Sequence, residues 1–234
     1  MLRLIFKVYS SSGLDGIKIL IELNNTPSIT DPVTLIVGGD ALRIVLGADE
    51  LLAESDIFYE KTFGVIVTDS AGNPIKNQKV DFTITATDYI KGYMELVDTS
   101  VPADGKPDAW QQNITTLPGT SSCPNEDFDN DGQLDAGEDT NNNGKLDPTQ
   151  AASVTGTGTT DDQGKLTVKV VYPQSEALWS KQLLTAKTVV EGTEFVENTS
   201  FVLPMTAEDF KKVDSGLPNE LSPYGRATDC SNKD

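Results

Sequence analysis

The chain has 234 residues, 37% of them hydrophobic, which is enough to bury a core in one large or two small domains. Its formal net charge is −18, and a field of that sign disfavours nucleic acid and anionic membrane surfaces as partners. Histidine is absent, which removes the commonest general base, the triads that depend on it, and most zinc and iron sites. We therefore expect no enzymatic activity.

The sequence contains neither a candidate membrane span nor a recognisable signal peptide. No apolar run approaches the length needed to span a bilayer, so we expect no direct membrane insertion. Residues 1–6 are apolar except for Arg3, but the apolar run is too short for a signal peptide and no small-residue cleavage site follows. We expect the sequence to be a piece of a longer exported protein.

Residues 1–38 alternate as short strands separated by Ser/Gly-rich and Asn/Pro turns, at 2–9, 17–23 and 33–37. Three strands cannot form a sandwich alone. Two interpretations stay open: the terminal strands of a preceding, incomplete repeat, or an assembly segment that adds strands to a neighbouring subunit's sheet. Gly38 and Gly39 mark a joint to the next segment.

Residues 39–204 carry the period-two alternation of half-buried strands, with turns such as 69–74 and 161–164 between them. This pattern predicts an all-β, antiparallel sandwich. A helical turn at 175–180 carries Trp179, which we assign to the core or its rim. The predicted strands are 41–46, 58–68, 79–87, 152–157, 165–172, 182–190 and 195–203.

A long insertion at 88–151 interrupts the strands, and its acidic part has the spacing of a calcium loop, D-x-[DN]-x-[DN]-G-x5-E. Calcium takes six to eight oxygen ligands, and a short loop can bring several carboxylates together around it. Leu134 is expected to point into apolar surface. The predicted ligands of the first loop are Asp127, Asp129, Asp131, the carbonyl of Gln133, Asp135 (directly or through water) and Glu138.

A second loop follows at once and repeats Gly-x-Leu-Asp in register. Gln150 stands where its closing Glu would be, so we expect a weaker site, or one that borrows Glu138 or another carboxylate. No flanking helix pair is evident, and the alternative is an acidic disordered loop. We expect one Ca²⁺ and regard a second as possible, with ligands Asp139, Asn141, Asn143, the carbonyl of Lys145, and Asp147.

The two cysteines, Cys123 and Cys230, are either buried thiols or a disulfide. We favour the disulfide, because Cys123 adjoins the acidic loop and Cys230 lies in a polar tail, 205–234, that has little else to hold it. This tail begins with a short helical stretch at 207–212. A disulfide together with strong acidity suggests an extracellular or cell-surface setting.

Two stretches resemble the bacterial Ig-like repeats of group 1, the modules of invasin and intimin. One is Val-Thr-Asp-Ser-Ala-Gly-Asn-Pro-Ile at 67–75, followed by Gln-Lys-Val-Asp-Phe at 78–82; the other is Thr-Asp-Asp-Gln-Gly-Lys-Leu at 160–166. The resemblance covers about residues 41–87 and 152–203, and the long insertion departs from the short repeats. It implies an Ig-like stalk or adhesin module of a bacterial surface protein, but it supplies no ligand.

Three functions compete on this basis. The leading one is a structural or adhesive module stiffened by calcium, with neighbouring repeats or copies of itself as partners and strand addition into a filament as a further possibility. The alternative is a ligand-binding module for a glycan or surface receptor, with Tyr89, Tyr93 and Trp110 as a stacking platform; such aromatics more often cover a hydrophobic edge of the sandwich. Paired carboxylates of a glycosidase are the third, which the metal-ligand spacing disfavours.

Overall fold

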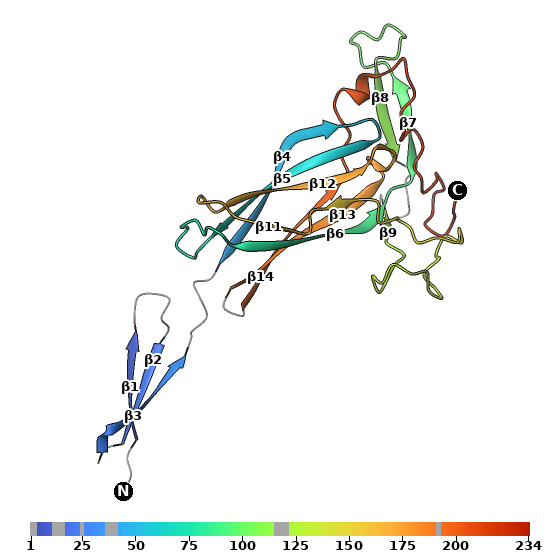
Figure 1. Ribbon diagram of the computed structural model, residues 1–234. Helices are drawn as coiled ribbons and strands as arrows, with labels where there is room; N and C mark the ends of the chain where they lie inside the picture. Colours follow the sequence, from blue (N-terminus) through green and yellow to red (C-terminus); the bar gives the residue numbers. More distant parts are fainter. Residues whose placement is uncertain (1–3, 11–16, 24–25, 36–41, 115–121, 191–192) are drawn as a thin grey trace.

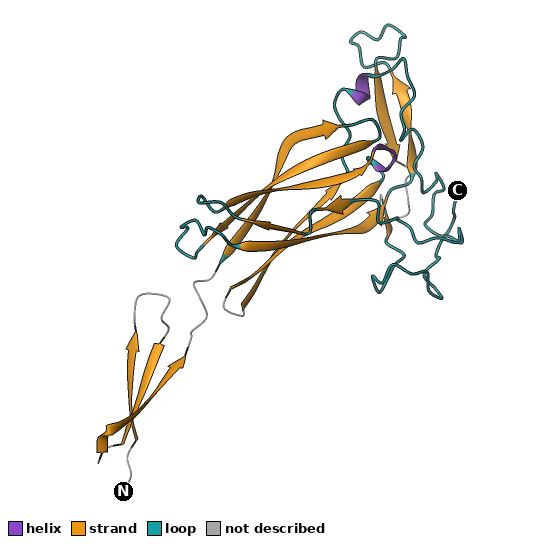
Figure 2. Cartoon of the chain, viewed as in Figure 1, coloured by secondary structure: helices purple, strands orange, loops and turns teal. Residues whose placement is uncertain are grey.

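The computed structural model describes residues 4–10, 17–23, 26–35, 42–114, 122–190 and 193–234. Their regular structure is almost entirely antiparallel strands joined by loops, and helix is confined to two short 3₁₀ turns (Figure 2), η1 (Gln174–Glu176) and η2 (Asp209–Lys211). The predicted all-β sandwich is confirmed. The joint at Gly38 and Gly39 lies outside the described residues.

Two sheets make up the sandwich (Figure 1). One has the order β10-β12-β5-β4, from β10 (Ser153–Val154), β12 (Lys165–Pro173), β5 (Phe58–Thr68) and β4 (Arg43–Glu54). The other has the order β11-β6-β13-β14, from β11 (Thr157–Thr159), β6 (Lys79–Tyr89), β13 (Ser180–Val190) and β14 (Thr193–Val202). A short strand, β9 (Cys123–Pro124), pairs with the end of β6.

The core lies between these sheets because alternate residues of each strand point inward. Phe63, Val65 and Val67 of β5 are buried, and Val80 and Phe82 of β6 are buried in the same core cluster. The rings of Phe63 and Phe201 approach to 4.9 Å between centroids. The period-two pattern in the sequence therefore correctly identified these inner faces. Trp179 is also fully buried, as predicted.

Several elements differ from the predicted ones. β4 is longer than expected and shifts register between Ala48 and Leu52. The helical turn predicted at 175–180 is the single 3₁₀ turn η1, and β13 already begins at Ser180. The insertion contains a hairpin that the sequence analysis missed, formed by β7 (Gly92–Val97) and β8 (Ala109–Ile114).

The N-terminal strands form a separate antiparallel sheet of order β1-β2-β3, from β1 (Leu4–Ser10), β2 (Ile17–Leu23) and β3 (Thr26–Leu35). The third strand therefore begins earlier than predicted. β2 is the central strand, in register with β1 from Ile17 to Leu23 and with β3 on its other side. Among the described residues these three strands pair only with one another.

Residues 205–234 contribute to the core as well as covering it. Met205, Leu217 and Tyr224 are buried, and the backbone carbonyl of Asn219 accepts a hydrogen bond of 2.9 Å from the indole of Trp179. The helical stretch predicted at 207–212 is only the 3₁₀ turn η2. The C-terminal segment is thus part of the folded unit, held by apolar contacts that its polar composition concealed.

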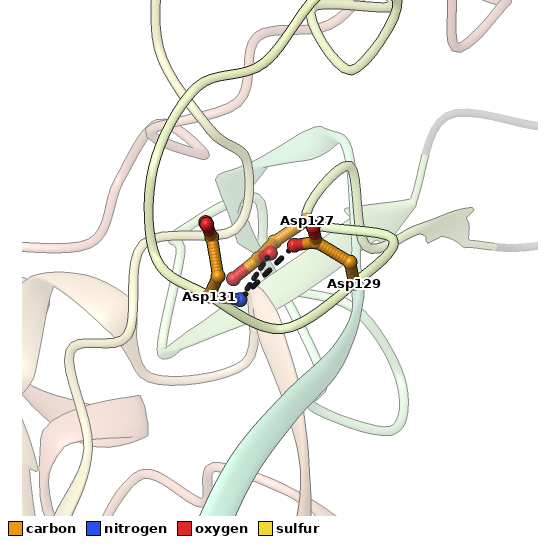
Figure 3. Close-up of side chains that lie close together, drawn as sticks. All are labelled: Asp127, Asp129 and Asp131. Carbon is orange, nitrogen blue, oxygen red and sulfur yellow. Dashed lines mark hydrogen bonds between the residues drawn. The ribbon is translucent and has the colours of Figure 1, made fainter.

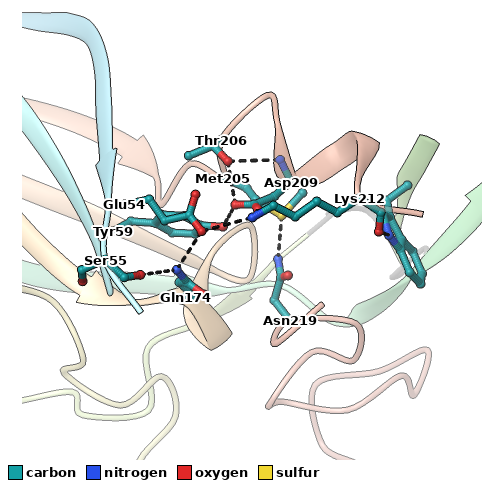
Figure 4. A network of polar contacts seen from close by, with 10 residues as sticks. Glu54, Ser55, Tyr59, Gln174, Met205, Thr206, Asp209, Lys212 and Asn219 are labelled. Atoms are coloured by element: carbon teal, nitrogen blue, oxygen red, sulfur yellow. Dashed lines mark hydrogen bonds and ion pairs between the residues drawn. The ribbon is translucent and has the colours of Figure 1, made fainter. Parts of the chain in front are cut away.

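A polar network ties this segment to the first sheet (Figure 4). Asp209 is almost fully buried and accepts hydrogen bonds from the hydroxyl of Tyr59 and from Thr206, the latter at 2.6 Å. Lys212 pairs with Asp209 and, at 3.2 Å, with Glu54. Burial by itself raises the pKa of Asp209, but hydrogen bonds from Lys212, Thr206 and Tyr59 outweigh it and hold that pKa below its ordinary value.

We predict that Asp209→Asn lowers the free energy of unfolding by about 1.5–3 kcal/mol at pH 7, because a charged hydrogen-bond acceptor is lost in a buried site. A depressed carboxylate pKa stabilises the fold above the unfolded value, and that contribution is lost as the pH falls through the folded pKa. The difference between wild type and variant, measured by urea unfolding, should therefore shrink below about pH 4. The exposed neighbour Glu208, changed to Gln, is the matched control; an equal loss in both variants would contradict the role of Asp209.

Candidate metal centre

The acidic segment is attached to β6 at both ends. At its start, the Asn125 side chain donates to the carbonyl of Ala86 (2.8 Å) and the Asn125 N–H to the carbonyl of Thr87 (3.0 Å). At its end, the Gln150 side chain accepts from the N–H of Ala86 (3.0 Å) and donates to the carbonyl of Ile84 (3.1 Å). Gln150 therefore anchors the segment to the sheet, although its position in the loop pattern is that of a closing ligand.

The first loop brings three predicted ligands together (Figure 3). Asp127, Asp129 and Asp131 each have a carboxylate oxygen within 4.8 Å of the others. The N–H of Asp131 donates to both Asp127 and Asp129 at 3.1 Å, and the N–H of Gly132 donates to Asp127 at 3.1 Å. Gly132 has φ = 75°, a left-handed conformation that favours glycine and lets the chain turn around the three carboxylates.

Glu138 closes this loop from the other side and is 5% exposed. One of its oxygens accepts from the N–H of Phe128 (2.9 Å) and the other from the N–H of Asp135 (3.0 Å). Gln133 donates through its N–H to Asp131 at 2.7 Å. The loop is therefore folded around its own carboxylates with the closing Glu in place.

Leu134, by contrast, is 43% exposed, so the expectation that it points into apolar surface is wrong. Phe128, on the same loop, is 63% exposed. No apolar surface of the described residues covers either side chain fully, because the loop projects from the end of the sandwich beside β9 (Figure 1).

The second loop repeats the first at a spacing of twelve residues. The N–H of Asn143 donates to Asp139 (2.9 Å) and to Asn141 (3.0 Å), and the N–H of Gly144 donates to Asp139 (3.0 Å). The N–H of Lys145 donates to Asn143 at 2.8 Å. The backbone repeats too, since Asn142 and Gly144 have φ values of 60° and 78°, against 60° and 75° at Asn130 and Gly132.

Glu126 occupies the closing place of this second loop. One of its oxygens accepts from the N–H of Asn141 and the other from the N–H of Asp147, both at 3.1 Å. Asp147 holds the position in the second loop that Asp135 holds in the first. Glu126 therefore accepts hydrogen bonds from two N–H groups of the second loop in nearly the same way as Glu138 does in the first. Glu126 is 1% exposed, and burial raises its pKa.

Sequence reasoning missed Glu126, which precedes the first loop rather than following the second. A signal for it is present: the pair Glu126-Asp127 recurs as Glu138-Asp139, twelve residues later. Each loop thus has one buried Glu, and the Glu138 side chain remains bonded to the first loop instead of being borrowed by the second.

Charge in the segment is not balanced internally. From Glu126 to Asp147 there are eight acids and one base, Lys145. Among the described residues, no ion pair involves any of these eight carboxylates. Their mutual repulsion favours binding of a cation, and the oxygen-only donor set suits a hard one.

A disulfide between Cys123 and Cys230 adjoins the segment, which confirms the favoured pairing and spans 107 residues. Beneath it, the buried ammonium of Lys91 donates to the carbonyls of Asp229 (3.1 Å) and Asn232. Tyr89 donates to the carbonyl of Cys230 at 3.5 Å, and burial with the nearby Glu126 carboxylate raises the pKa of Tyr89 to about 12. The disulfide and Lys91 therefore fix residues 229–232 beside the acidic loops.

The aromatic residues considered for glycan stacking do not form an open platform. Tyr89 is fully buried, and its ring lies 5.0 Å from that of Tyr224. Trp110 is partly buried against the core and donates to the carbonyl of Lys212 at 2.9 Å. Tyr93 lies under the guanidinium of Arg226, 5.8 Å from the ring centroid. These side chains cover the edge of the sandwich.

Fold and site together define a class: an antiparallel β-sandwich protein with a disulfide and a double acidic loop of calcium-binding pattern. No family model matches the chain, and none of the curated proteins does. No helix of the described residues is long and apolar enough to cross a membrane.

Two solved structures are similar to the chain at low levels. The Yersinia pseudotuberculosis adhesin InvE is 14% identical with a TM-score of 0.34; the similarity covers 86% of this chain, which spans about half (49%) of the length of that one. A structure of manganese lipoxygenase of Gaeumannomyces graminis with part of zonadhesin of Komagataella pastoris is 14% identical with a TM-score of 0.23, covering 86% of this chain and 62% of that one.

Reduction of the disulfide should destabilise the protein, because Cys123 and Cys230 close a long loop in the unfolded chain. We expect a loss of about 2–5 kcal/mol in the free energy of unfolding, measured by chemical denaturation with and without reductant. The double variant Cys123→Ala/Cys230→Ala should show the same loss, and reductant should then change nothing further. Wild-type curves that coincide in the two buffers would contradict the prediction.

Proposed function

We propose that the chain is a non-catalytic structural or adhesive β-sandwich module of a bacterial cell-surface or extracellular protein, and that calcium orders its two acidic loops. The observation that carries the calcium part is the repeated loop, in which each ring of oxygen-bearing side chains is closed by a buried Glu that bonds two backbone N–H groups. The disulfide and the acidic composition support the exported setting.

Eleven positions predicted from the sequence, with Glu126 added, would supply the oxygens. In the first loop these are the three clustered aspartates with Asp135, Glu138 and the carbonyl of Gln133. In the second they are Asp139, Asp147 and Glu126, the side-chain oxygens of Asn141 and Asn143, and the carbonyl of Lys145. The second loop has fewer carboxylates, so it is the weaker calcium site in this proposal.

Calcium should stabilise the protein by mass action, since it binds the folded loops and not the unfolded chain. At roughly 100 times the dissociation constant the gain is about 2.7 kcal/mol per site. Differential scanning calorimetry in millimolar calcium and in excess chelator measures it. Melting curves that do not move between the two buffers would exclude a calcium-ordered module.

Variants of the two buried glutamates, Glu138 and Glu126, test the two proposed sites independently. Glu138→Gln should weaken the first site roughly tenfold or more, and Glu126→Gln should do the same to the second, because each change removes a charged ligand. Isothermal titration calorimetry should therefore show a stronger and a weaker site in wild type, with the stronger site impaired in Glu138→Gln and the weaker site impaired in Glu126→Gln. The exposed Asp162→Asn, in the turn between β11 and β12 and outside both loops, is the control and should leave both sites intact.

Self-assembly by strand addition forms the other part of the proposal, with copies of the chain or neighbouring repeats as partners. In the three-stranded sheet, the outer edges of β1 and β3 have no paired strand among the described residues, and such edges accept further strands. Deleting residues 1–38 should lower the mass seen by light scattering with size-exclusion chromatography. An unchanged mass would rule out assembly through this segment.

A further inference from the structure

The outer face of the β4-β5-β12 sheet differs from the rest of this acidic chain. Val45 and Ile66 are 48% and 39% exposed there, and the strand register places Val45, Ile66 and Lys165 side by side. Arg43 lies one alternate position further along β4 and is also exposed. Within the described part of the chain, neither Arg43 nor Lys165 forms an ion pair.

Two glycines make this face concave. Gly47 and Gly64 are directly paired, with Thr167 next to Gly64, so adjacent strands lack side chains at the same level of the sheet. The result is a shallow groove of about 260 Å³ bordered by Val45, Ile66 and Lys165. Neither glycine has a positive φ, and a Cβ on either would meet its nearest neighbour only at 3.9–4.0 Å. The backbone therefore does not require glycine at these positions, and the groove itself is what they produce.

The first acidic loop has the complementary surface. Phe128 and Leu134 are 63% and 43% exposed; Phe128 stands between Asp127 and Asp129 in the sequence, and Leu134 precedes Asp135. The segment from Glu126 to Asp147 has a charge of −7, from eight acids and one base. With two calcium ions bound its charge is −7 + 4 = −3, so the loop stays negative in either state.

We propose that the acidic loop at 127–138 of one copy docks on the groove of the β4-β5-β12 sheet of a second copy. An exposed apolar side chain, Phe128, fills the depression over Gly47 and Gly64, and Arg43 and Lys165 face the carboxylates around it. Apolar burial supplies the contact energy and the opposite charges orient the two surfaces.

This contact joins two different patches, so it is heterologous. Each chain has one loop and one groove, and a heterologous contact that does not close into a ring continues as a chain of molecules. The contact uses the sandwich and its loop, and is independent of strand addition through residues 1–38. Because the charges lie at the surface, association should weaken as salt is raised.

Sedimentation velocity of the full chain over a concentration series, in calcium buffer, measures the association. Phe128→Ser removes the apolar side chain and Gly64→Val fills the groove; valine suits a strand and the space at Gly64 admits it. Each variant should associate about tenfold or more weakly than wild type. Leu134→Ser gives a second test on the loop. Matched controls are the exposed Val101→Ser, and Thr83→Val on the outer face of the other sheet, both expected to behave as wild type.

Mixing the two variants gives the sharpest test. Gly64→Val retains a working loop and Phe128→Ser retains a working groove, so an equimolar mixture should form a dimer of twice the chain mass and nothing larger. A wild-type chain that stays monomeric throughout would overturn the proposal. So would association that both variants leave unchanged, which would point to residues 1–38, or a mixture that does not recover the dimer. Loss of calcium binding, in contrast, would be seen in the calorimetric titration and not in sedimentation velocity.

Discussion

Electrostatic repulsion among the carboxylates of residues 126–147 is the constraint on which the arrangement of the two acidic loops depends, and with them the C-terminal residues fixed beside them. Eight acids share that segment with one lysine, and within the described residues none of the eight forms an ion pair. Three of them, Glu126, Glu138 and Asp147, are almost fully buried. Burying a carboxylate is costly unless it is hydrogen-bonded. Each of the two glutamates accepts hydrogen bonds from two backbone N–H groups, and Asp147 accepts from the side-chain amides of Asn141 and Asn143.

β6 is the strand that makes such an arrangement possible. It pairs with β13 and β11 within its sheet and with β9 at the start of the insertion. Asn125 and Gln150 then bond the same few residues of β6 from the two ends of the acidic segment. The segment is thus a closed loop on a rigid strand, and the disulfide from Cys123 brings the C-terminal residues against it. The conformation of the loops and the stability of the sandwich are therefore linked through these attachments.

The sequence predicted well whatever depends on neighbours along the chain. Strands β5, β12 and β13 follow from alternation, and Phe63, Val65 and Val67 are inward because the side-chain period of a strand is two. The first acidic loop is similar: Asp127, Asp129 and Asp131 converge because Gly132 allows a tight turn only a few residues long. The sequence pattern did not predict the β7-β8 hairpin, because its strands mix polar and apolar residues without clear alternation.

By itself, then, the sequence determined the all-β class, the inner faces of the sandwich and the local geometry of both acidic loops, because these arise from periodicity and short-range turns. Only the tertiary structure decided that Glu126 closes the second loop and that the Gln150 side chain is hydrogen-bonded to β6. It alone decided that Leu134 stays exposed and that Gly47 pairs with Gly64 to leave a groove. Each of these depends on strand register and on contacts between distant residues, which no local pattern specifies.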